Sequence, residues 1–64
     1  LESTEALSAR LLKDGITHLI FFDESNELYE RAMPLAADGE LYSWTLYEVL
    51  PDGAGGVSLT EYYY

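Results

Sequence analysis

The side chains that could do chemistry gather around one apolar segment of the chain. His18, the only histidine, lies inside the run 15–23, and Asp23, Glu24 and Glu27 stand where that run ends. Carboxylates at the carboxyl end of a strand could bind a hard cation or act as a general base. The same residues are typical of a turn and a helix N-terminus, and their spacing does not match a calcium loop. We therefore predict no metal site, cofactor or catalytic residue, and interpret His18 as a buried, hydrogen-bonded core histidine.

A glycine-rich stretch, 53–56, invites comparison with a phosphate-binding loop. It lacks the lysine and the following serine or threonine of such a loop, so we interpret it as a turn between two strands. No hydroxyl group has an obvious base partner, and so small a fold leaves little room for an enclosed pocket. We predict that the chain by itself is not an enzyme. The alternative is a small enzyme that uses the carboxylates near Asp23.

The composition indicates a folded acidic domain. Of the 64 residues 48% are hydrophobic, which argues against disorder, while 12 acidic and 3 basic residues give a net charge of −9. This charge should repel nucleic acids and anionic membranes and favour a protein partner with a basic surface, although solubility alone also explains it. No segment approaches the roughly 20 apolar residues of a membrane span. Because the sequence starts at Leu1 rather than at methionine, we expect it to be either trimmed or a piece of a longer protein.

Residues 16–22 are the strongest strand candidate. Apolar side chains occupy both faces of this segment: Ile16, Ile20 and Phe22 on one, Leu19 and Phe21 on the other. A strand that is apolar on both faces is typical of the middle of a sheet. We therefore predict a central strand with other strands on both sides.

An amphipathic helix is predicted over residues 3–14, before this strand. Ser3 or Thr4 can cap its first turn, and Gly15 supplies the left-handed residue that ends it. Ile16 should pack back on Leu11, as in a Schellman motif.

The segment 24–33 fits two structures. As a helix it has a cap at Asp23 or Ser25 and a Glu27–Arg31 pair, and Pro34 ends it. As a strand it would form a hairpin with 16–22, but its alternation does not separate apolar from polar residues. We favour the helix.

Two further strands are predicted at 41–50 and 57–63. We assign Trp44, in the first of them, to the core. Pairing Val49 with Val57 and Tyr47 with Leu59 places similar residues opposite one another in an antiparallel hairpin.

Together these elements predict a single domain, 1–64, with the order helix, strand, helix, strand, strand. The fold class is α/β: a small two-layer domain with a mixed three-stranded sheet, whose first two strands run parallel across a right-handed crossover. The alternative is an α+β fold with one helix on a four-stranded antiparallel sheet.

A non-catalytic binding or accessory domain that acts through protein–protein contact is the function these features favour. Exposed carboxylates would meet a basic surface, and the terminal tyrosines are the amphipathic side chains that interfaces favour. The candidate partner-binding residues are Asp23, Glu24, Glu27, Glu30, Tyr62, Tyr63 and Tyr64. The sequence gives no indication of the compartment.

Two stretches carry a resemblance to a known family. The run 11–20, Leu-Leu-Lys-Asp-Gly-Ile-Thr-His-Leu-Ile, and the later run 44–50, Trp-Thr-Leu-Tyr-Glu-Val-Leu, are similar to the soluble tail of polytopic membrane glycosyltransferases of the protein mannosyltransferase type. The resemblance implies an extracytoplasmic accessory tail beside the catalytic part. It implies no catalytic residue, because the family's catalytic acidic residues lie in membrane-adjacent loops that have no counterpart in these 64 residues. Residues 51–64 have no counterpart in the pattern either.

Overall fold

Two α-helices, a short 3-10 helix and three strands make up residues 2–62, the part of the chain that the computed structural model describes. In chain order they are α1 (Thr4–Lys13), β1 (His18–Ile20), α2 (Glu27–Ala32), η1 (Met33–Leu35), β2 (Leu46–Pro51) and β3 (Val57–Glu61). The predicted element order is confirmed, and the ambiguous segment 24–33 contains a helix.

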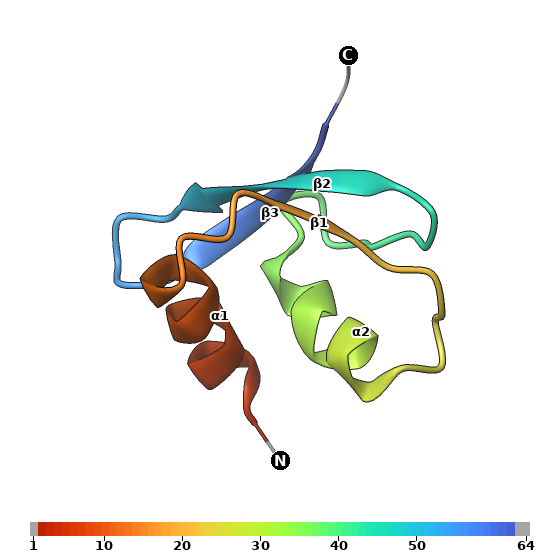
Figure 1. Cartoon of the computed structure of the whole chain (residues 1–64), viewed down its shortest axis with the longest axis horizontal. Helices are drawn as coiled ribbons and strands as arrows, with labels where there is room; N and C mark the ends of the chain where they lie inside the picture. Colours follow the sequence, from red (N-terminus) through yellow and green to blue (C-terminus); the bar gives the residue numbers. More distant parts are fainter. Residues whose placement is uncertain (1, 63–64) are drawn as a thin grey trace.

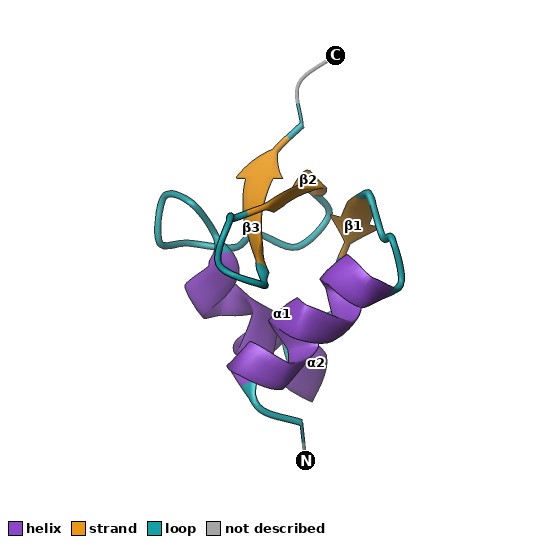
Figure 2. Cartoon of the chain, turned by 90° about the vertical axis from the view of Figure 1, so that its left-hand side faces the viewer, coloured by secondary structure: helices purple, strands orange, loops and turns teal. Residues whose placement is uncertain are grey.

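The helices and the sheet form two layers. Both helices lie on one face of the sheet, as Figure 1 shows from one side and Figure 2 after a quarter turn. The predicted small two-layer domain that mixes helix and strand is therefore confirmed. The other face of the sheet carries no helix within residues 2–62, and we call it the outer face.

The two ends of α1 are capped as predicted. Ser3 precedes the helix, and its Oγ accepts a hydrogen bond of 3.1 Å from the Ala6 N–H. Gly15 follows the helix with φ 68°, and the Ile16 N–H donates to the Leu11 carbonyl at 3.2 Å. This bond is the long one of a Schellman motif, so the sequence signal at Gly15 was sufficient to place the end of the helix.

The cap of α2 differs from the prediction. Asn26 caps the helix, and its Oδ1 accepts a hydrogen bond of 2.7 Å from the Leu28 N–H. Asp23 instead closes the turn before it, where its Oδ1 accepts from the N–H and the Oγ of Ser25. The α-helix ends at Ala32, before Pro34, as predicted, and the chain continues directly into η1, which contains Pro34.

The direction of β2 corrects the sequence prediction. β1 and β2 run antiparallel, with Ile20 opposite Leu46, and the sheet is antiparallel throughout rather than mixed. A parallel crossover would have to start β2 beside the beginning of β1. Instead the Trp44 N–H donates to the Phe21 carbonyl at 2.6 Å, which fixes the approach to β2 at the far end of β1. The six-residue helix α2 is followed by the segment 36–45, which brings the chain back to that end.

The position of β1 is a second correction. The strand order is β1-β2-β3, so β2 is the central strand and β1 is an edge. Only one face of β1 is covered: Phe21, just after the strand, is buried and Leu19 is half-buried, whereas Ile20 and Phe22 are exposed. Apolar residues on both faces therefore did not imply burial of both faces.

The second strand begins later than predicted, and its tryptophan is not in the core. Trp44 has a left-handed backbone, with φ 60°, which breaks the extended run before β2 starts at Leu46. Trp44 is 70% exposed. The loop before it is held by Tyr47, whose hydroxyl accepts a hydrogen bond of 2.7 Å from the Tyr42 N–H. The aromatic core residue of this segment is thus Tyr47, at 1% exposure, and not Trp44.

The β2–β3 hairpin is confirmed as antiparallel, but its register differs by two residues from the prediction. Val49 lies opposite Leu59 and Pro51 opposite Val57. The connection is tighter than expected because the Asp52 N–H donates to the Gly56 carbonyl at 3.1 Å. Because side chains alternate with a period of two, a shift of two residues leaves the same side chains together on each face of the hairpin.

The hairpin loop contains a carboxylate whose titration should influence stability. The backbone N–H groups of Ala54 and Gly56 donate to Asp52 and hold the pKa of its carboxyl below the ordinary 3.8. Because the folded pKa is lowered, this stabilisation is complete above the unfolded pKa and is lost as the pH falls through the folded pKa. We expect Asp52→Ala to lower the melting temperature at neutral pH and the difference from the parent to shrink below pH 3.8. Melting curves across this range check the prediction, and a constant difference would contradict it.

The core lies between the two layers. Its buried apolar residues come from α1, α2 and the inner face of the sheet, and the contributors are Leu7, Leu11, Phe21, Tyr29, Ala32, Ala36, Leu41, Tyr47, Val49, Val57 and Leu59. The Tyr29 hydroxyl donates to the Leu41 carbonyl inside this cluster, so the loop after η1 is attached to α2. This bond holds the segment that leads to β2 against the helical layer.

Candidate functional site

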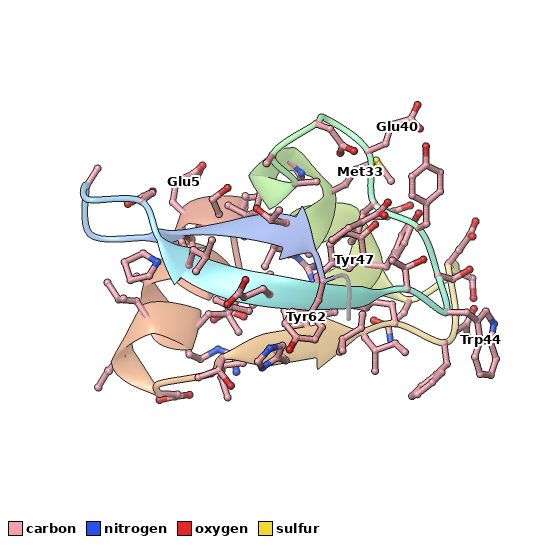
Figure 3. The ribbon with its side chains drawn as sticks, turned by 90° about the horizontal axis from the view of Figure 1, so that it is seen from above. Glu5, Met33, Glu40, Trp44, Tyr47 and Tyr62 are labelled. Atoms are coloured by element: carbon pink, nitrogen blue, oxygen red, sulfur yellow. The ribbon has the colours of Figure 1, made fainter. Side chains whose placement is uncertain are left out.

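The outer face of the sheet presents apolar side chains to solvent. Ile20 lies opposite Leu46, and the Tyr62 N–H donates to the Leu46 carbonyl at 2.9 Å, so these three residues form a row across the strands. Ile20 and Tyr62 are exposed, and Leu46 is half-buried. The next row is polar, with His18 opposite Glu48. Figure 3, which views the sheet from above, shows Tyr62 over the middle of this face and Trp44 beyond its end.

An exposed aromatic pair extends the apolar row at one end of the sheet. The rings of Phe22 and Trp44 meet at 62° with centroids 4.8 Å apart. Phe22 is 59% exposed and Trp44 is 70% exposed. The two residues come from different loops, one after β1 and one before β2. We call Phe22 and Trp44 the aromatic pair.

Hydrogen bonds between the two loops hold the aromatic pair in place. The Trp44 N–H donates to the carbonyl of Phe21, the neighbour of Phe22, at 2.6 Å. The Ser43 Oγ donates to Glu24 Oε2 at 2.6 Å. The loop that carries Phe22 and the loop that carries Trp44 are therefore joined by two hydrogen bonds and do not present the aromatic pair independently.

The predicted acidic residues separate into two groups. Asp23 and Glu24 lie in the loop that follows Phe22, and the hydrogen bonds from Ser25 lower the pKa of the Asp23 carboxyl, which keeps it ionised. Glu27 and Glu30 belong to α2, in the helical layer. Glu27 pairs with Arg31 there at 3.5 Å. The structure thus brings two of the four predicted carboxylates beside the aromatic pair.

Of the predicted tyrosines, Tyr62 meets the histidine on the outer face. Tyr62 contacts His18 edge-on, with ring centroids 5.0 Å apart. His18 is exposed, and its Nδ1 lies 3.0 Å from the Thr17 Oγ1. The interpretation of His18 as a buried core residue was wrong, because the strand that carries it is at the edge of the sheet and turns this side chain to solvent. Tyr63 and Tyr64 lie outside the described residues.

Charge is distributed unevenly between the layers. All three basic residues are in helices: Arg10 and Lys13 in α1, and Arg31 in α2. Arg10 forms an ion pair of 2.8 Å with Glu2. The strands carry no lysine or arginine, and Glu48 is on the outer face. The carboxylates near the aromatic pair and on the outer face, Asp23, Glu24 and Glu48, therefore have no lysine or arginine on the strands beside them.

An open groove with two carboxylates lies between α2 and the loop that precedes β2. It is lined by Glu24, Tyr29, Met33, Glu40, Leu41 and Tyr42. Tyr42 donates a hydrogen bond to Glu40, which raises the pKa of Tyr42 to about 12 and keeps the phenol protonated. Within residues 2–62, no three histidine or acidic side chains come together as a metal site. The absence of enzymatic activity stays a prediction.

The comparisons with known proteins identify no family for this chain. No protein-family model, no curated protein and no solved structure matches the chain. The resemblance to the soluble tails of membrane glycosyltransferases therefore stays a prediction. In the described part of the chain, neither α1 nor α2 has the length and apolar character needed to cross a membrane.

Sequence reasoning named the acidic loop and Tyr62 as candidate binding residues, which stays a prediction, and it did not predict the exposed aromatic pair. Phe22 had been counted among the residues of a central strand and Trp44 among those of the core. A signal for Trp44 was present, because it stands between Ser43 and Thr45 and follows the turn at Asp38-Gly39, where a strand need not yet have begun. No comparable signal marks Phe22, whose exposure depends on which side of the sheet the helices cover.

Proposed function

We propose that this domain binds a basic segment of another protein on the outer face of its sheet, with the aromatic pair as the anchor. The observation that carries the proposal is the combination found at Trp44: a tryptophan that is 70% exposed and has a backbone φ of 60°. Both properties are unfavourable for the isolated domain. A partner that covers the indole would offset them.

The backbone of Trp44 is costly for a side chain of this size. A left-handed conformation costs roughly 1–2 kcal/mol for a residue with a Cβ atom, and glycine avoids that cost. A buried tryptophan could compensate through its large apolar area, but Trp44 buries little of it. Strained residues of this kind cluster at binding sites, where the strain positions a side chain in advance.

The composition of the surface supports a protein partner. Tryptophan and tyrosine dominate the binding energy of many interfaces because they are large, fairly rigid and amphipathic. Tyr62 lies over the outer face, with Ile20 and Leu46 beside it, and Trp44 lies beyond the end of that face. An accessory role within a larger protein would use this surface in the same way.

The charge of the surface indicates that the partner is basic. Asp23 and Glu24 are next to the aromatic pair, and the domain carries a net charge of −9. A lysine or arginine side chain over the indole of Trp44 would gain about 0.5–2 kcal/mol from the cation–π interaction and could also reach these carboxylates. Nucleic acids and anionic membranes would be repelled by the same charge.

Trp44→Gly should separate binding from folding. We expect the variant to be about as stable as the parent, because relief of backbone strain offsets the lost contact with Phe22. It should bind a basic probe at least tenfold more weakly, a loss of about 1.4 kcal/mol. A suitable probe is an acetylated peptide of about ten alternating lysines and valines, which can lie extended on a sheet. Calorimetric titration measures the affinity, and urea unfolding measures the stability.

A matched pair of variants measures how much the carboxylate beside the aromatic pair contributes to binding of the basic peptide. Glu24→Gln and Glu5→Gln remove the same charge, one beside the aromatic pair and one in the first turn of α1. Glu24→Gln should weaken binding of the peptide more than Glu5→Gln does, and added salt should reduce the difference. Equal affinity of the parent and Trp44→Gly for the peptide would contradict the proposal.

A further inference from the structure

The two edges of the sheet differ in how they are covered. Beside β3, the segment after η1 forms a parallel bridge between Ala36 and Leu59, and the Ala37 N–H donates to the Leu59 carbonyl at 2.8 Å. Beside β1, no segment of residues 2–62 pairs with the side that faces away from β2. Figure 3 shows this open side of β1 along the border of the sheet, with the aromatic pair's Trp44 beyond its end.

The register identifies which backbone groups point out of the sheet. The Val49 N–H donates to the Thr17 carbonyl at 2.8 Å, so Thr17 and Val49 form a hydrogen-bonded pair. Pairing in an antiparallel ladder alternates, so Leu19 also bonds to β2. The N–H and C=O groups of His18 and Ile20 therefore point away from β2, toward the open edge.

We propose that the basic segment of the partner adds to the sheet as a fourth strand along β1. This inference rests on the proposed function and specifies its geometry. The backbone groups of His18 and Ile20 would supply main-chain hydrogen bonds, as in other cases of strand addition to an exposed sheet edge. Side chains of the added strand that point to the outer face would lie next to Ile20.

The surroundings of β1 favour a basic segment over a second copy of this chain. A strand that continues past Ile20 reaches the aromatic pair and then Asp23 and Glu24, where a lysine or arginine has both an indole and carboxylates to contact. A second copy would bring another net charge of −9 to the same edge. Like charges at close range oppose that association.

The test uses the lysine–valine peptide and two N-methylated forms of it. One form carries N-methyl groups on every valine, the other on every lysine. Alternate residues of a strand direct their N–H groups to opposite sides, so only one of the two forms blocks the bonds to β1. We expect that form to bind at least tenfold more weakly than the other. The amide protons of His18 and Ile20 should exchange more slowly when the unmodified peptide is bound.

The outcomes distinguish this inference from the proposed function. If both N-methylated forms bind alike, or if the peptide binds without slowing exchange at His18 and Ile20, strand addition is wrong and the proposed function stands. If the unmodified peptide does not bind, both fail. Slower exchange at these amides as the concentration of the domain alone rises would identify a second copy as the occupant and overturn the assignment to a basic segment.

Discussion

Phe21→Ala should reduce the free energy of unfolding by about 3–5 kcal/mol, which is most of what a domain of this size possesses. Phe21 is 8% exposed and packs edge-to-face on Tyr29, with ring centroids 5.7 Å apart. Removal of the ring leaves a cavity between the sheet and α2. We expect the variant to be largely unfolded at room temperature, which far-ultraviolet circular dichroism would reveal.

The neighbouring residue provides a matched control for this substitution. Phe22→Ala removes the same side chain from the adjacent position, but Phe22 is 59% exposed and contacts Trp44 at the surface. The loss should be at most about 1.5 kcal/mol, the contribution of an aromatic pair. Similar melting temperatures for Phe21→Ala and Phe22→Ala would show that the two faces of β1 have been assigned incorrectly.

Gly56→Ala should destabilise the domain by about 1–3 kcal/mol through a clash at a buried junction. A Cβ atom at Gly56 would lie 2.3 Å from the Oγ of Ser8, which is buried in α1. That Oγ cannot simply move aside, because it accepts a hydrogen bond of 2.7 Å from the Val57 N–H. This contact joins α1 to the start of β3, two segments far apart in the sequence.

A double-mutant cycle tests whether the clash has this origin. Ser8→Ala alone leaves the buried Val57 N–H without its acceptor and should cost about 1–3 kcal/mol. In the Ser8→Ala background the nearest atom to the new Cβ is Asp52 Oδ2 at 3.2 Å, so Gly56→Ala should cost much less. The two effects should therefore be non-additive by about 0.5–3 kcal/mol in urea unfolding. Additive effects would refute the proposed contact.

Phe21 connects the core to the aromatic pair. Phe21 is buried on one side of the β1 end, and its carbonyl accepts the hydrogen bond from Trp44 that positions the aromatic pair. A rigid core residue thus stands directly next to an exposed one in the sequence. Variants for binding studies should avoid Phe21, because any loss of binding there would reflect loss of the fold.

Local signals in the sequence were sufficient for the ends of α1 and for the presence of the hairpin. Ser3 and Gly15 mark the ends of α1 because caps depend only on residues within one or two turns. The hairpin was recognised, but its register was not, since the bonds between Asp52 and the backbone of its own loop shorten the connection. The hydrogen bonds of the turn therefore determined the register of the hairpin more strongly than the pairing of similar residues, such as Val49 with Val57, on which the prediction was based.

The direction and position of β1 were decided by the tertiary structure. Its residues alternate between faces, and both sets are apolar, so the sequence contains no information on which set the helices cover. Contacts between distant segments, among them the bonds from Trp44 to Phe21 and from Val49 to Thr17, align β2 antiparallel to β1. Because β3 pairs with the other side of β2, β1 is left at the edge. The composition determined that the domain is acidic and folded. Only the packing of both helices on one face determined that Ile20, Phe22 and Trp44 are exposed, because burial depends on what the rest of the chain covers.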